Sequence, residues 1–486
     1  MKRQKKTAAL AVGLLTAVLL SGCGTKDYDK LLNRKAPVSI TIWHYYNGVQ
    51  QTQFDEMVEA FNNSVGNEKG IYVESYSKNS VDELAESVLA SLNGEPGAED
   101  APDIFGTYAE TAYQIDKMGK LADLSKYVTQ EEKAEYVEEY LLEGSFGGEE
   151  SLKIFPTAKS TEVMMVNLTD WQKFADAAGV SLDELKTWEG LNAVAQQYYQ
   201  YTDDLTPDVP GDGKAFFGRD SVANYLTVGA KQLGKPFAEE ASDGTYKASL
   251  DKDTVRRLWE QFYVPYVKGY FTSENRFRSD DAKVGAIIAL VGSTTGAAYY
   301  PAEVTIDDEY TYPIENVVLP VPNFEGCDPY LVQQGAGMSV IASDEKKEYA
   351  CTLFLKWFTE AERNISFSVR SGYLPVKKAA NDYSALVESG GTAQINDTML
   401  NTLKTAIDEV NSYTLYTSPP YDASAQVRTY LGAAFENTAK EAQAAVKERI
   451  AAGEDREALL QEYTDETAFE SWYAAFEKGF YETIGE

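Results

Sequence analysis

The 486-residue chain has very little histidine and cysteine. It contains one histidine, His44, and three cysteines. A structural zinc site takes about four Cys or His ligands, and a serine or cysteine triad takes a histidine. These counts exclude most zinc chemistry and leave His44 as the only residue on which a histidine-dependent mechanism could be built. We predict neither a metal nor a cofactor.

Basic residues are also scarce relative to acidic ones. The chain has 44 Lys and Arg against 76 Asp and Glu, which gives a formal charge of −32. Such a surface repels phosphate backbones and anionic headgroups, so nucleic acid is a poor partner. Hydrophobic residues make up 44% of the chain and charged residues 25%, as in ordinary globular proteins. The length predicts two or three domains or one large two-lobed body.

Long hydrophobic runs are missing except for one near the N-terminus. Residues 7–20 carry no charge and follow four basic residues. The run is shorter than the roughly 18 to 20 residues that a membrane-spanning helix needs, so we interpret residues 1–22 as a signal peptide. Its end, Leu-Ser-Gly-Cys at 20–23, closely resembles a bacterial lipobox, which implies a lipid on Cys23. An ordinary cleaved secretory signal or an uncleaved anchor is the alternative.

A lipid on Cys23 would hold the folded body at the outer face of the bacterial cell membrane. Residues 23–36 have few apolar side chains, and we expect them to form a short lipidated tether. Cys327 and Cys351 are then the remaining cysteines. Two cysteines in a body of this size do not make a disulfide framework.

What the sequence does contain is a regular alternation of strand and helix patterns after residue 37. Residues 38–43 alternate apolar and polar side chains, and apolar residues at helical spacing follow up to Phe61. A strand at 71–73, a helix at 81–92 and a strand at 104–105 continue the order. This order predicts an open, mostly parallel sheet with helices on both faces.

Side chains suited to a sugar follow each of these strands. In open sheets, ligands bind beyond the carboxyl ends of the strands. Planar polar groups pair with sugar hydroxyls, and aromatic rings stack on the apolar faces of the sugar. His44 could instead cap a loop. The candidates are Trp43, His44, Tyr45, Asn79, Tyr108 and Glu110.

The second half of the chain shows further strands and a helical end. Residues 284–291 form a continuous apolar run, which predicts a buried parallel strand. The Gly/Ser/Thr loop that follows lacks the lysine of a phosphate loop, which argues against nucleotide binding. Aspartates within 203–220 do not match the spacing of a calcium loop, and we favour a solvated loop. Long helical stretches dominate from Ser424 to the end.

Several short segments, taken in their order and spacing, resemble one family. They are 40–43, 101–105, 155–163, 187–189, 319–322, 334–340, 354–358 and 372–376. With the lipobox, this set resembles the family 1 extracellular solute-binding proteins of carbohydrate ABC importers, the group that includes maltose-binding protein. The resemblance covers nearly all of the chain after residue 37.

The resemblance implies an α/β, two-lobed, periplasmic-binding-protein-like fold. Each lobe would be an open, mostly parallel sheet flanked by helices, and a hinge that the chain crosses several times would join them. Lobe one would comprise 38–158 and 336–396, and lobe two 159–335 and 397–486. Cys327 and Cys351 would then lie in different lobes, so we expect them not to pair.

The resemblance also implies a function and a site. The protein would be a monomer without enzymatic activity that captures a sugar or oligosaccharide between the lobes and presents it to the permease subunits of an ABC importer. Trp43 is the leading candidate for stacking on the ligand. The further residues implied to bind the ligand are Glu162, Ser293, Thr294, Gln333, Gln334, Tyr373 and Tyr416.

A secreted lipoprotein glycoside hydrolase is the main alternative. Hydrolysis of a glycosidic bond takes two carboxylates about 5 to 10 Å apart, and a chain this acidic can furnish such a pair. No motif in the sequence brings two carboxylates to one point, so we favour binding over catalysis. Within the binding class, a peptide or a polyamine is a weaker option than a sugar.

Lipidation can be tested directly on Cys23. Labelled palmitate should enter the wild-type protein in a bacterial host and should not enter the Cys23→Ala variant, because that variant lacks the thiol that carries the lipid. Gel fluorography of both proteins measures the difference. Equal labelling of the two forms would contradict the lipobox assignment.

Overall fold

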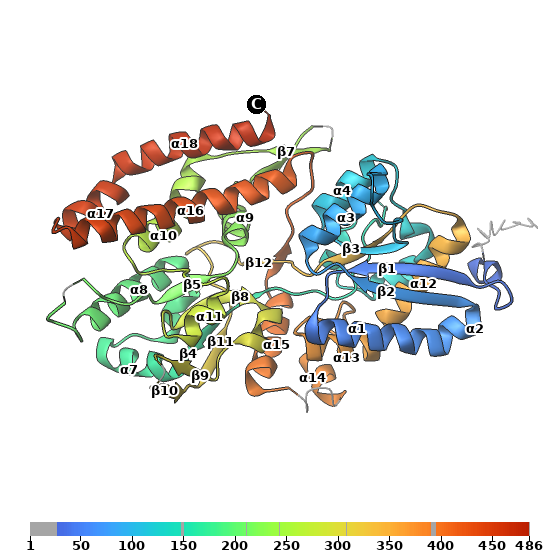
Figure 1. Cartoon of the computed structure of the whole chain (residues 1–486), viewed down its shortest axis with the longest axis horizontal. Coiled ribbons are helices and arrows are strands. Elements are labelled where there is room, and N and C mark those ends of the chain that lie inside the picture. The colour runs from blue at the N-terminus through green and yellow to red at the C-terminus, as the bar shows by residue number, and fades with distance from the viewer. Residues whose placement is uncertain are drawn as a thin grey trace, which may run out of the picture.

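The computed structural model describes residues 27–146, 150–209, 211–242, 244–307, 309–389 and 395–485. The signal peptide predicted at 1–22 and the lipidation site predicted at Cys23 lie outside these residues. Two α/β lobes lie side by side, with the N-terminal strands in one lobe and the C-terminal helices on the other (Figure 1). Within the described chain, no helix has the length and apolar character to span a membrane.

The sheet of lobe one has the strand order β13-β3-β1-β2. β1 (Val38–His44) runs parallel to β2 (Ile71–Ser77) and to β3 (Ile104–Thr107), whereas β13 (Gly337–Val340) runs antiparallel to β3. The three N-terminal strands and the mostly parallel sheet predicted for this lobe are confirmed.

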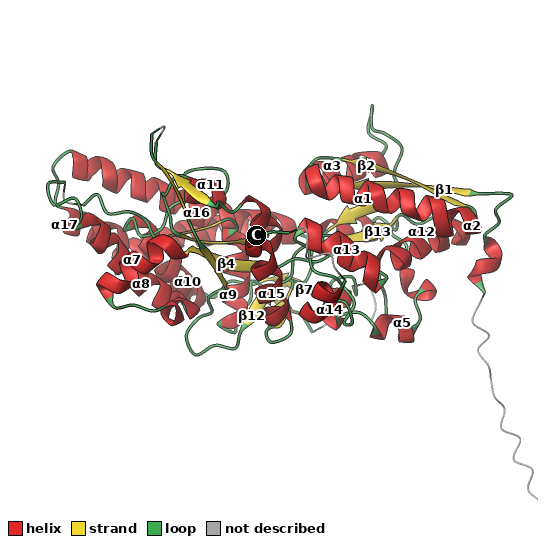
Figure 2. Cartoon of the chain, turned by 90° about the horizontal axis from the view of Figure 1, so that it is seen from below, coloured by secondary structure: helices red, strands yellow, loops and turns green. Residues whose placement is uncertain are grey.

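Helices cover both faces of the lobe-one sheet, as the red helices around the yellow strands show (Figure 2). One core packs the apolar sides of α1, α12 and α13 against β1 and β2, and a second core packs α3 and α4 against β1 and β3. The helices of this lobe are α1 (Gly48–Phe61), η2 (Asn62–Gly66), α2 (Asn67–Lys69), α3 (Val81–Asn93), α4 (Ala109–Lys117), η3 (Leu124–Tyr127), α5 (Gln130–Ala134), α6 (Glu138–Leu142), α12 (Glu345–Phe358) and α13 (Ala361–Ser371). α14 (Tyr383–Glu388) instead packs beside α15 (Asp397–Val410), and its Leu386 lies in a core with Met165 and Leu290 of lobe two.

Part of the predicted tether packs against lobe one. The short helix η1 (Tyr28–Leu31) places the Tyr28 ring 4.8 Å from that of Tyr127 and 5.4 Å from that of Tyr349. Asp29 pairs with Lys69, with 2.7 Å between Oδ2 and Nζ. Residues Tyr28–Leu31 therefore belong to the folded body, and the predicted tether does not run free as far as residue 36.

The sheet of lobe two is mixed, with the order β11-β4-β8-β5. β4 (Glu162–Asn167) runs antiparallel to both β8 (Ala289–Ser293) and β11 (Asn316–Leu319), and the parallel pair is β5 (Phe217–Arg219) with β8. The prediction of a mostly parallel sheet is wrong for this lobe. The apolar run predicted as a strand at 284–291 is buried only from Ile287 onward, and the strand begins at Ala289, whereas Val284 is 49% exposed. Burial also does not fix the direction of a neighbouring strand.

Lobe two carries its own set of helices and two small hairpins. They are α7 (Leu168–Ala178), η4 (Leu182–Lys186), α8 (Trp188–Asp203), α9 (Val222–Gln232), α10 (Lys252–Val267), α11 (Arg278–Lys283), η5 (Thr294–Tyr299) and α15 (Asp397–Val410), with β6 (Ala238–Glu240) paired to β7 (Tyr246–Ala248) and β9 (Glu303–Thr305) paired to β10 (Thr311–Pro313).

The C-terminal helices form an outer layer on lobe two. α16 (Ser424–Ala451) and α18 (Glu466–Ile484) lie side by side, joined through α17 (Arg456–Thr464) (Figure 1). Phe435 of α16 packs against Trp472 of α18, with 4.7 Å between the ring centroids. The apolar side of α16 joins the main core of the lobe, so this layer is part of the folded body.

The chain passes between the lobes along extended segments. β12 (Tyr330–Val332) pairs in parallel with β14 (Thr414–Tyr416), and Ser160 forms a backbone bridge with Gln334. At this hinge the side chains of Lys159 and Glu143 form an ion pair and are 0% and 2% exposed. The same ammonium donates to the Gly335 carbonyl at 2.8 Å. The ion pair therefore links lobe one to two hinge segments.

The position of Trp43 in the lobe-one core gives a stability prediction. The indole is 3% exposed, packs in the core that contains Phe105 and Ile115, and has the Lys78 ammonium 4.0 Å from its ring centroid. Trp43→Ala should lower the free energy of unfolding by about 3 to 5 kcal/mol, because it leaves a cavity. Chemical denaturation of the ligand-free protein measures this loss.

Tyr72 supplies the control for that measurement. It lies on β2 of the same sheet with 52% of its surface exposed, so Tyr72→Ala should cost less than about 1 kcal/mol. Equal stability losses in the two variants would show that Trp43 is not a core residue.

Candidate functional site

A cleft of about 480 Å³ lies between the two lobes. Lobe one contributes the first turns of α3 and α4, lobe two contributes α9 and α16, and the ends of β12 and β14 form part of its lining. The polar and aromatic residues that line it are Asp82, Tyr108, Glu110, Thr111, Glu143, Asp220, Ser221, Asn224, Thr227, Gln333, Gln334, Tyr416, Thr417, Ser418, Arg428, Thr429 and Glu436.

Five of the residues predicted from the sequence line this cleft. They are Tyr108, Glu110, Gln333, Gln334 and Tyr416. Tyr108 and Glu110 lie at the start of α4 because β3 ends at Thr107 and the chain turns there into the helix. That these side chains bind a ligand remains a prediction.

Trp43 and His44 do not line the cleft, and the structure corrects their predicted place. Successive side chains of a strand point to opposite faces, and here helices cover both faces. Trp43 therefore packs beneath α3 and α4, and His44 packs against Phe54 of α1, with 4.9 Å between the rings. Both are buried at the end of β1 rather than exposed beyond it.

Tyr45 and Tyr373 lie next to the hinge but outside the cleft lining. Their hydroxyl oxygens are 3.2 Å apart, and the backbone N–H of Ala336 donates to the Tyr45 hydroxyl at 3.2 Å. Tyr373 is buried in the core of lobe one. The pair fixes a hinge segment in place.

Asn79, Ser293 and Thr294 also lie outside the lining. Asn79 has a left-handed backbone (φ 64°) at an exposed turn and donates to Glu83 at 2.9 Å. Ser293 caps η5, which turns the chain away at the end of β8. Thr294 is fully buried, and its N–H donates to the Thr161 carbonyl at 2.9 Å.

Glu162 lies below the cleft wall of lobe two and organises it. It accepts hydrogen bonds from Arg219 at 2.6 Å and from Asn224 at 2.9 Å. The Arg219 guanidinium lies 5.5 Å from the rings of both Trp188 and Tyr225. Asn224 in turn accepts from Arg428 at 2.5 Å. A chain of hydrogen bonds thus runs from the lobe-two core to Arg428 in the cleft.

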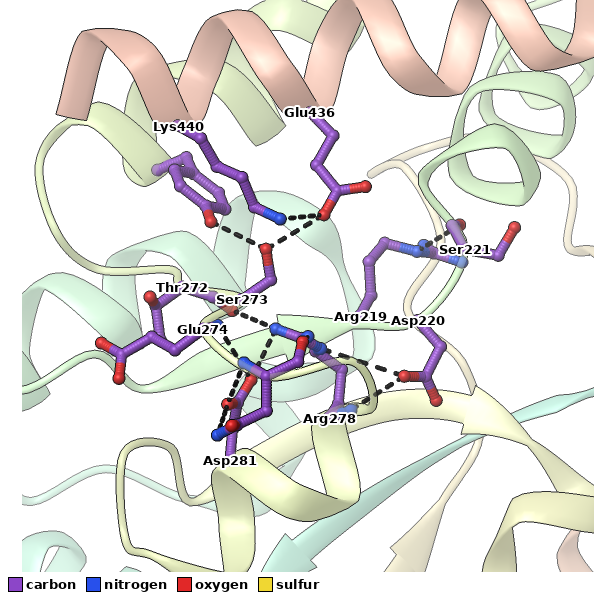
Figure 3. A network of polar contacts seen from close by, with 12 residues as sticks. Arg219, Asp220, Ser221, Thr272, Ser273, Glu274, Arg278, Asp281, Glu436 and Lys440 are labelled. Carbon is purple, nitrogen blue, oxygen red and sulfur yellow. Dashed lines mark hydrogen bonds and ion pairs between the residues drawn. The ribbon is translucent and has the colours of Figure 1, made fainter. Parts of the chain in front are cut away.

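Two carboxylates of the lobe-two wall are tied to their own lobe, as Figure 3 shows. Glu436 accepts from Ser273 at 3.0 Å and pairs with Lys440 at 2.8 Å. Asp220 accepts from the backbone N–H of Arg278 at 2.9 Å, and burial raises the pKa of its carboxyl group. Both acids therefore have protein partners.

The lobe-one wall centres on Tyr108. Burial raises the pKa of its phenol to about 12, and the charges of Glu143, Arg428 and Glu110 all act on it. Burial also raises the pKa of Glu143, against the opposing effect of Lys159. Acidic and basic groups from both lobes thus lie close to one tyrosine hydroxyl.

Sequence reasoning missed the contribution of α16. The residues of this helix that line the cleft are small or polar and lie on one face, while Val427, Leu431 and Phe435 face the core. The sequence signal for this face of α16 was a stripe of small and polar residues opposite a stripe of apolar residues. The stripe comprises Ala425, Arg428, Thr429, Gly432 and Glu436.

A family model described as bacterial extracellular solute-binding protein matches residues 56–394, more than two thirds of the chain. This chain belongs to that family. A comparison with curated proteins finds no match. The family assignment agrees with the resemblance that the sequence motifs carried.

Several solved structures share the two-lobed fold of this chain. A cyclic alpha-maltosyl-1,6-maltose binding protein from Arthrobacter globiformis is 17% identical, with a TM-score of 0.61 over 88% of this chain and 100% of that one. UgpB from Mycobacterium tuberculosis, in complex with glycerophosphocholine, is 18% identical, with a TM-score of 0.63 over 88% and 99%. MalE from Bdellovibrio bacteriovorus, bound to maltotriose, is 16% identical, with a TM-score of 0.57 over 85% and 100%. At these identities the likeness shows the fold.

The burial of His44 predicts a pH dependence of stability. Its Nδ1 accepts from the Tyr46 N–H at 3.2 Å, its Nε2 is buried without a partner in the described chain, and burial lowers its pKa from 6.5 to about 4. Between pH 6.5 and about pH 4, the His44 imidazole is protonated in the unfolded chain but mostly neutral in the folded chain. Lowering the pH from 7 to 4 should therefore cost roughly 3 kcal/mol of folding free energy through this group, with no effect above about pH 7.

His44 is the chain's only histidine, so its imidazole signal in NMR is unambiguous. Because carboxylates also titrate in this range, the stability loss should be measured against His44→Asn, whose side-chain oxygen can still accept from the Tyr46 N–H. A folded-state imidazole pKa near 6.5 would contradict the buried environment.

Proposed function

We propose that this solute-binding protein captures a sugar or oligosaccharide in the interlobe cleft and presents it to the permease subunits of an ABC importer. A lipid on Cys23 would hold it at the outer face of the cell membrane, as a monomer that does not alter its ligand. Family membership supports the solute-binding part of this proposal.

The observation that carries the proposal is the pairing of opposite chemistry across the cleft. Arg428 on lobe two is held by Asn224 and keeps further N–H groups for a ligand, while Glu110 on lobe one offers carboxylate oxygens. A ligand hydroxyl can accept from a guanidinium and donate to a carboxylate. Tyr108 and Tyr416 add aromatic surface for the apolar faces of a sugar ring.

The names of the similar structures support the same ligand class. Two of those described above are named for binding maltose-type saccharides, one cyclic and one linear. A third was solved with glycerophosphocholine, so the fold alone does not select a sugar. The polar and aromatic lining of this cleft favours the saccharide.

A glycoside hydrolase would need a free carboxylate pair in the same cleft. Glu110 and Glu143 both lie on the lobe-one side, but Glu143 is committed to a buried ion pair with Lys159 and accepts from Gln333 at 3.3 Å. Glu143 is thus held by protein partners and is not free to act on a ligand. For this pair of carboxylates, the arrangement favours binding without hydrolysis.

Ligand binding should raise the melting temperature of the body without its signal peptide. A saccharide present at about 100 times its dissociation constant should stabilise the folded state by about 2.7 kcal/mol. A thermal-shift screen against mono- and oligosaccharides measures the effect, and chromatography of the incubated sugars detects hydrolysis. Protein-dependent products would favour the hydrolase, and a panel without any stabilising saccharide would contradict the proposal.

Arg428→Ala should weaken the binding of any saccharide found in that screen by about 10- to 100-fold. The guanidinium makes charge-assisted hydrogen bonds worth about 1.5 to 3 kcal/mol, and about 1.4 kcal/mol is tenfold in affinity. Arg449→Ala is the matched control, because Arg449 lies on the same helix and pairs with Glu454 outside the cleft lining. Calorimetric titration of both variants compares the affinities.

A further inference from the structure

The charges around the cleft are unbalanced. Among the described residues that line it, five carry carboxylates and Arg428 alone carries a cation. A neutral saccharide leaves such an excess uncompensated when it displaces water from the cleft, and removing water from an unpaired charge is costly. The carboxylates belong to Asp82, Glu110, Glu143, Asp220 and Glu436.

Protein cations compensate some of these acids but not all. Glu143 pairs with Lys159, and Glu436 pairs with Lys440. Asp220 has the Nε of Arg278 at 3.9 Å, but that guanidinium also pairs with the fully buried Asp281 at 2.5 Å, as the network in Figure 3 shows.

Asp82 and Glu110 are the acids without a protein partner. Within the described chain, no hydrogen bond or ion pair reaches either carboxylate. Asp82 is exposed at the start of α3, whereas Glu110 is half-buried in the first turn of α4. Arg428 can offset one of these two charges, so the other carboxylate stays without a cation in the cleft lining.

An independent observation points to a ligand that donates hydrogen bonds here. Gln334 lines the cleft, and its amide oxygen is covered and has no hydrogen-bond partner in the described chain. An amide oxygen and an ionised carboxylate can accept hydrogen bonds but cannot donate them. Gln334 therefore adds an acceptor that a donor group of the ligand can satisfy.

A metal ion is a poor partner for these acceptor groups. In the described residues, no three acidic, histidine or cysteine side chains are grouped closely enough to hold an ion. The carboxylates are instead distributed over both walls of the cleft. An extended organic ligand with its own positive charge fits this distribution.

We propose that the captured solute is an amino-substituted saccharide whose protonated amino group lies against Glu110 on the lobe-one wall. The inference rests on the proposed function, because it takes the saccharide part from there. An ammonium group supplies three donors and one positive charge, which suit the unpaired carboxylate and the amide oxygen of Gln334. The hydroxyls of the same ligand pair with Arg428, and Asp82 at the rim attracts the cation during approach.

The test compares saccharides that differ in one substituent. The probes are β-1,4-linked glucosamine oligomers, their cellulose and N-acetylated counterparts, glucosamine, galactosamine and mannosamine with the parent hexoses, and free spermidine. Calorimetric titration of the soluble body at pH 7 should show an amino member binding at least about tenfold more tightly than its neutral partner. Raising the NaCl concentration should weaken the amino member selectively, because salt screens the charge pair.

Variants locate the amino group. Glu110→Gln should lower the ratio of amino to neutral affinity by about tenfold, because it removes the partner charge and keeps the shape. Glu86→Gln is the matched control, since Glu86 is an exposed acid of α3 outside the cleft lining. An equal loss in both variants would overturn the placement at Glu110.

The remaining outcomes separate this inference from the proposed function. Neutral saccharides that bind as tightly as their amino partners would overturn the amino-substituted ligand and leave saccharide capture standing. Spermidine binding as tightly as the best saccharide would overturn the saccharide class. The absence of binding by every saccharide, amino or neutral, would overturn the proposed function itself.

Discussion

The buried ion pair between Glu143 and Lys159 is the interaction on which the cleft and the hinge both depend. Lys159 lies where the chain first leaves lobe one, and it also holds the Gly335 carbonyl of a second hinge segment. Removing either charge would leave the other buried and unpaired, at a cost of about 3 to 5 kcal/mol. The outer contact between the lobes, from Lys117 to Asp422, is exposed and worth far less. The ion pair at the floor of the cleft is thus the stronger of these two contacts.

Much of the fold could be predicted because local patterns determine it. Alternation at 38–43 and helical spacing up to Phe61 correctly predicted the first strand and helix, since burial on one face imposes those periods. Strand direction in lobe two could not be predicted, because β4 is buried on both faces and its pattern carries no sign of antiparallel neighbours. The docking of Tyr28 on lobe one was missed for a similar reason, since its partners Tyr127 and Tyr349 lie far away in sequence.

The site was harder to predict than the fold. The rule that ligands bind beyond strand ends placed Tyr108 and Glu110 in the cleft, but it failed for Trp43 and His44, which helices cover at the end of β1. The lobe-two wall comes from α9 and α16, whose cleft residues are separated by about 200 positions in the chain. The hydrogen bond from Arg428 to Asn224 is a tertiary contact, and no local spacing encodes it.

The two-sided character of α16 has a consequence for how this protein can change. Its apolar side, with Leu431 and Phe435, secures the C-terminal layer to the lobe-two core, while its polar side forms a wall of the cleft. Substitutions on the polar side alter the chemistry offered to a solute without disturbing the packing that holds the helix. One helix face can therefore change the lining of the cleft by a few point changes, while the sheets and the hinge stay the same.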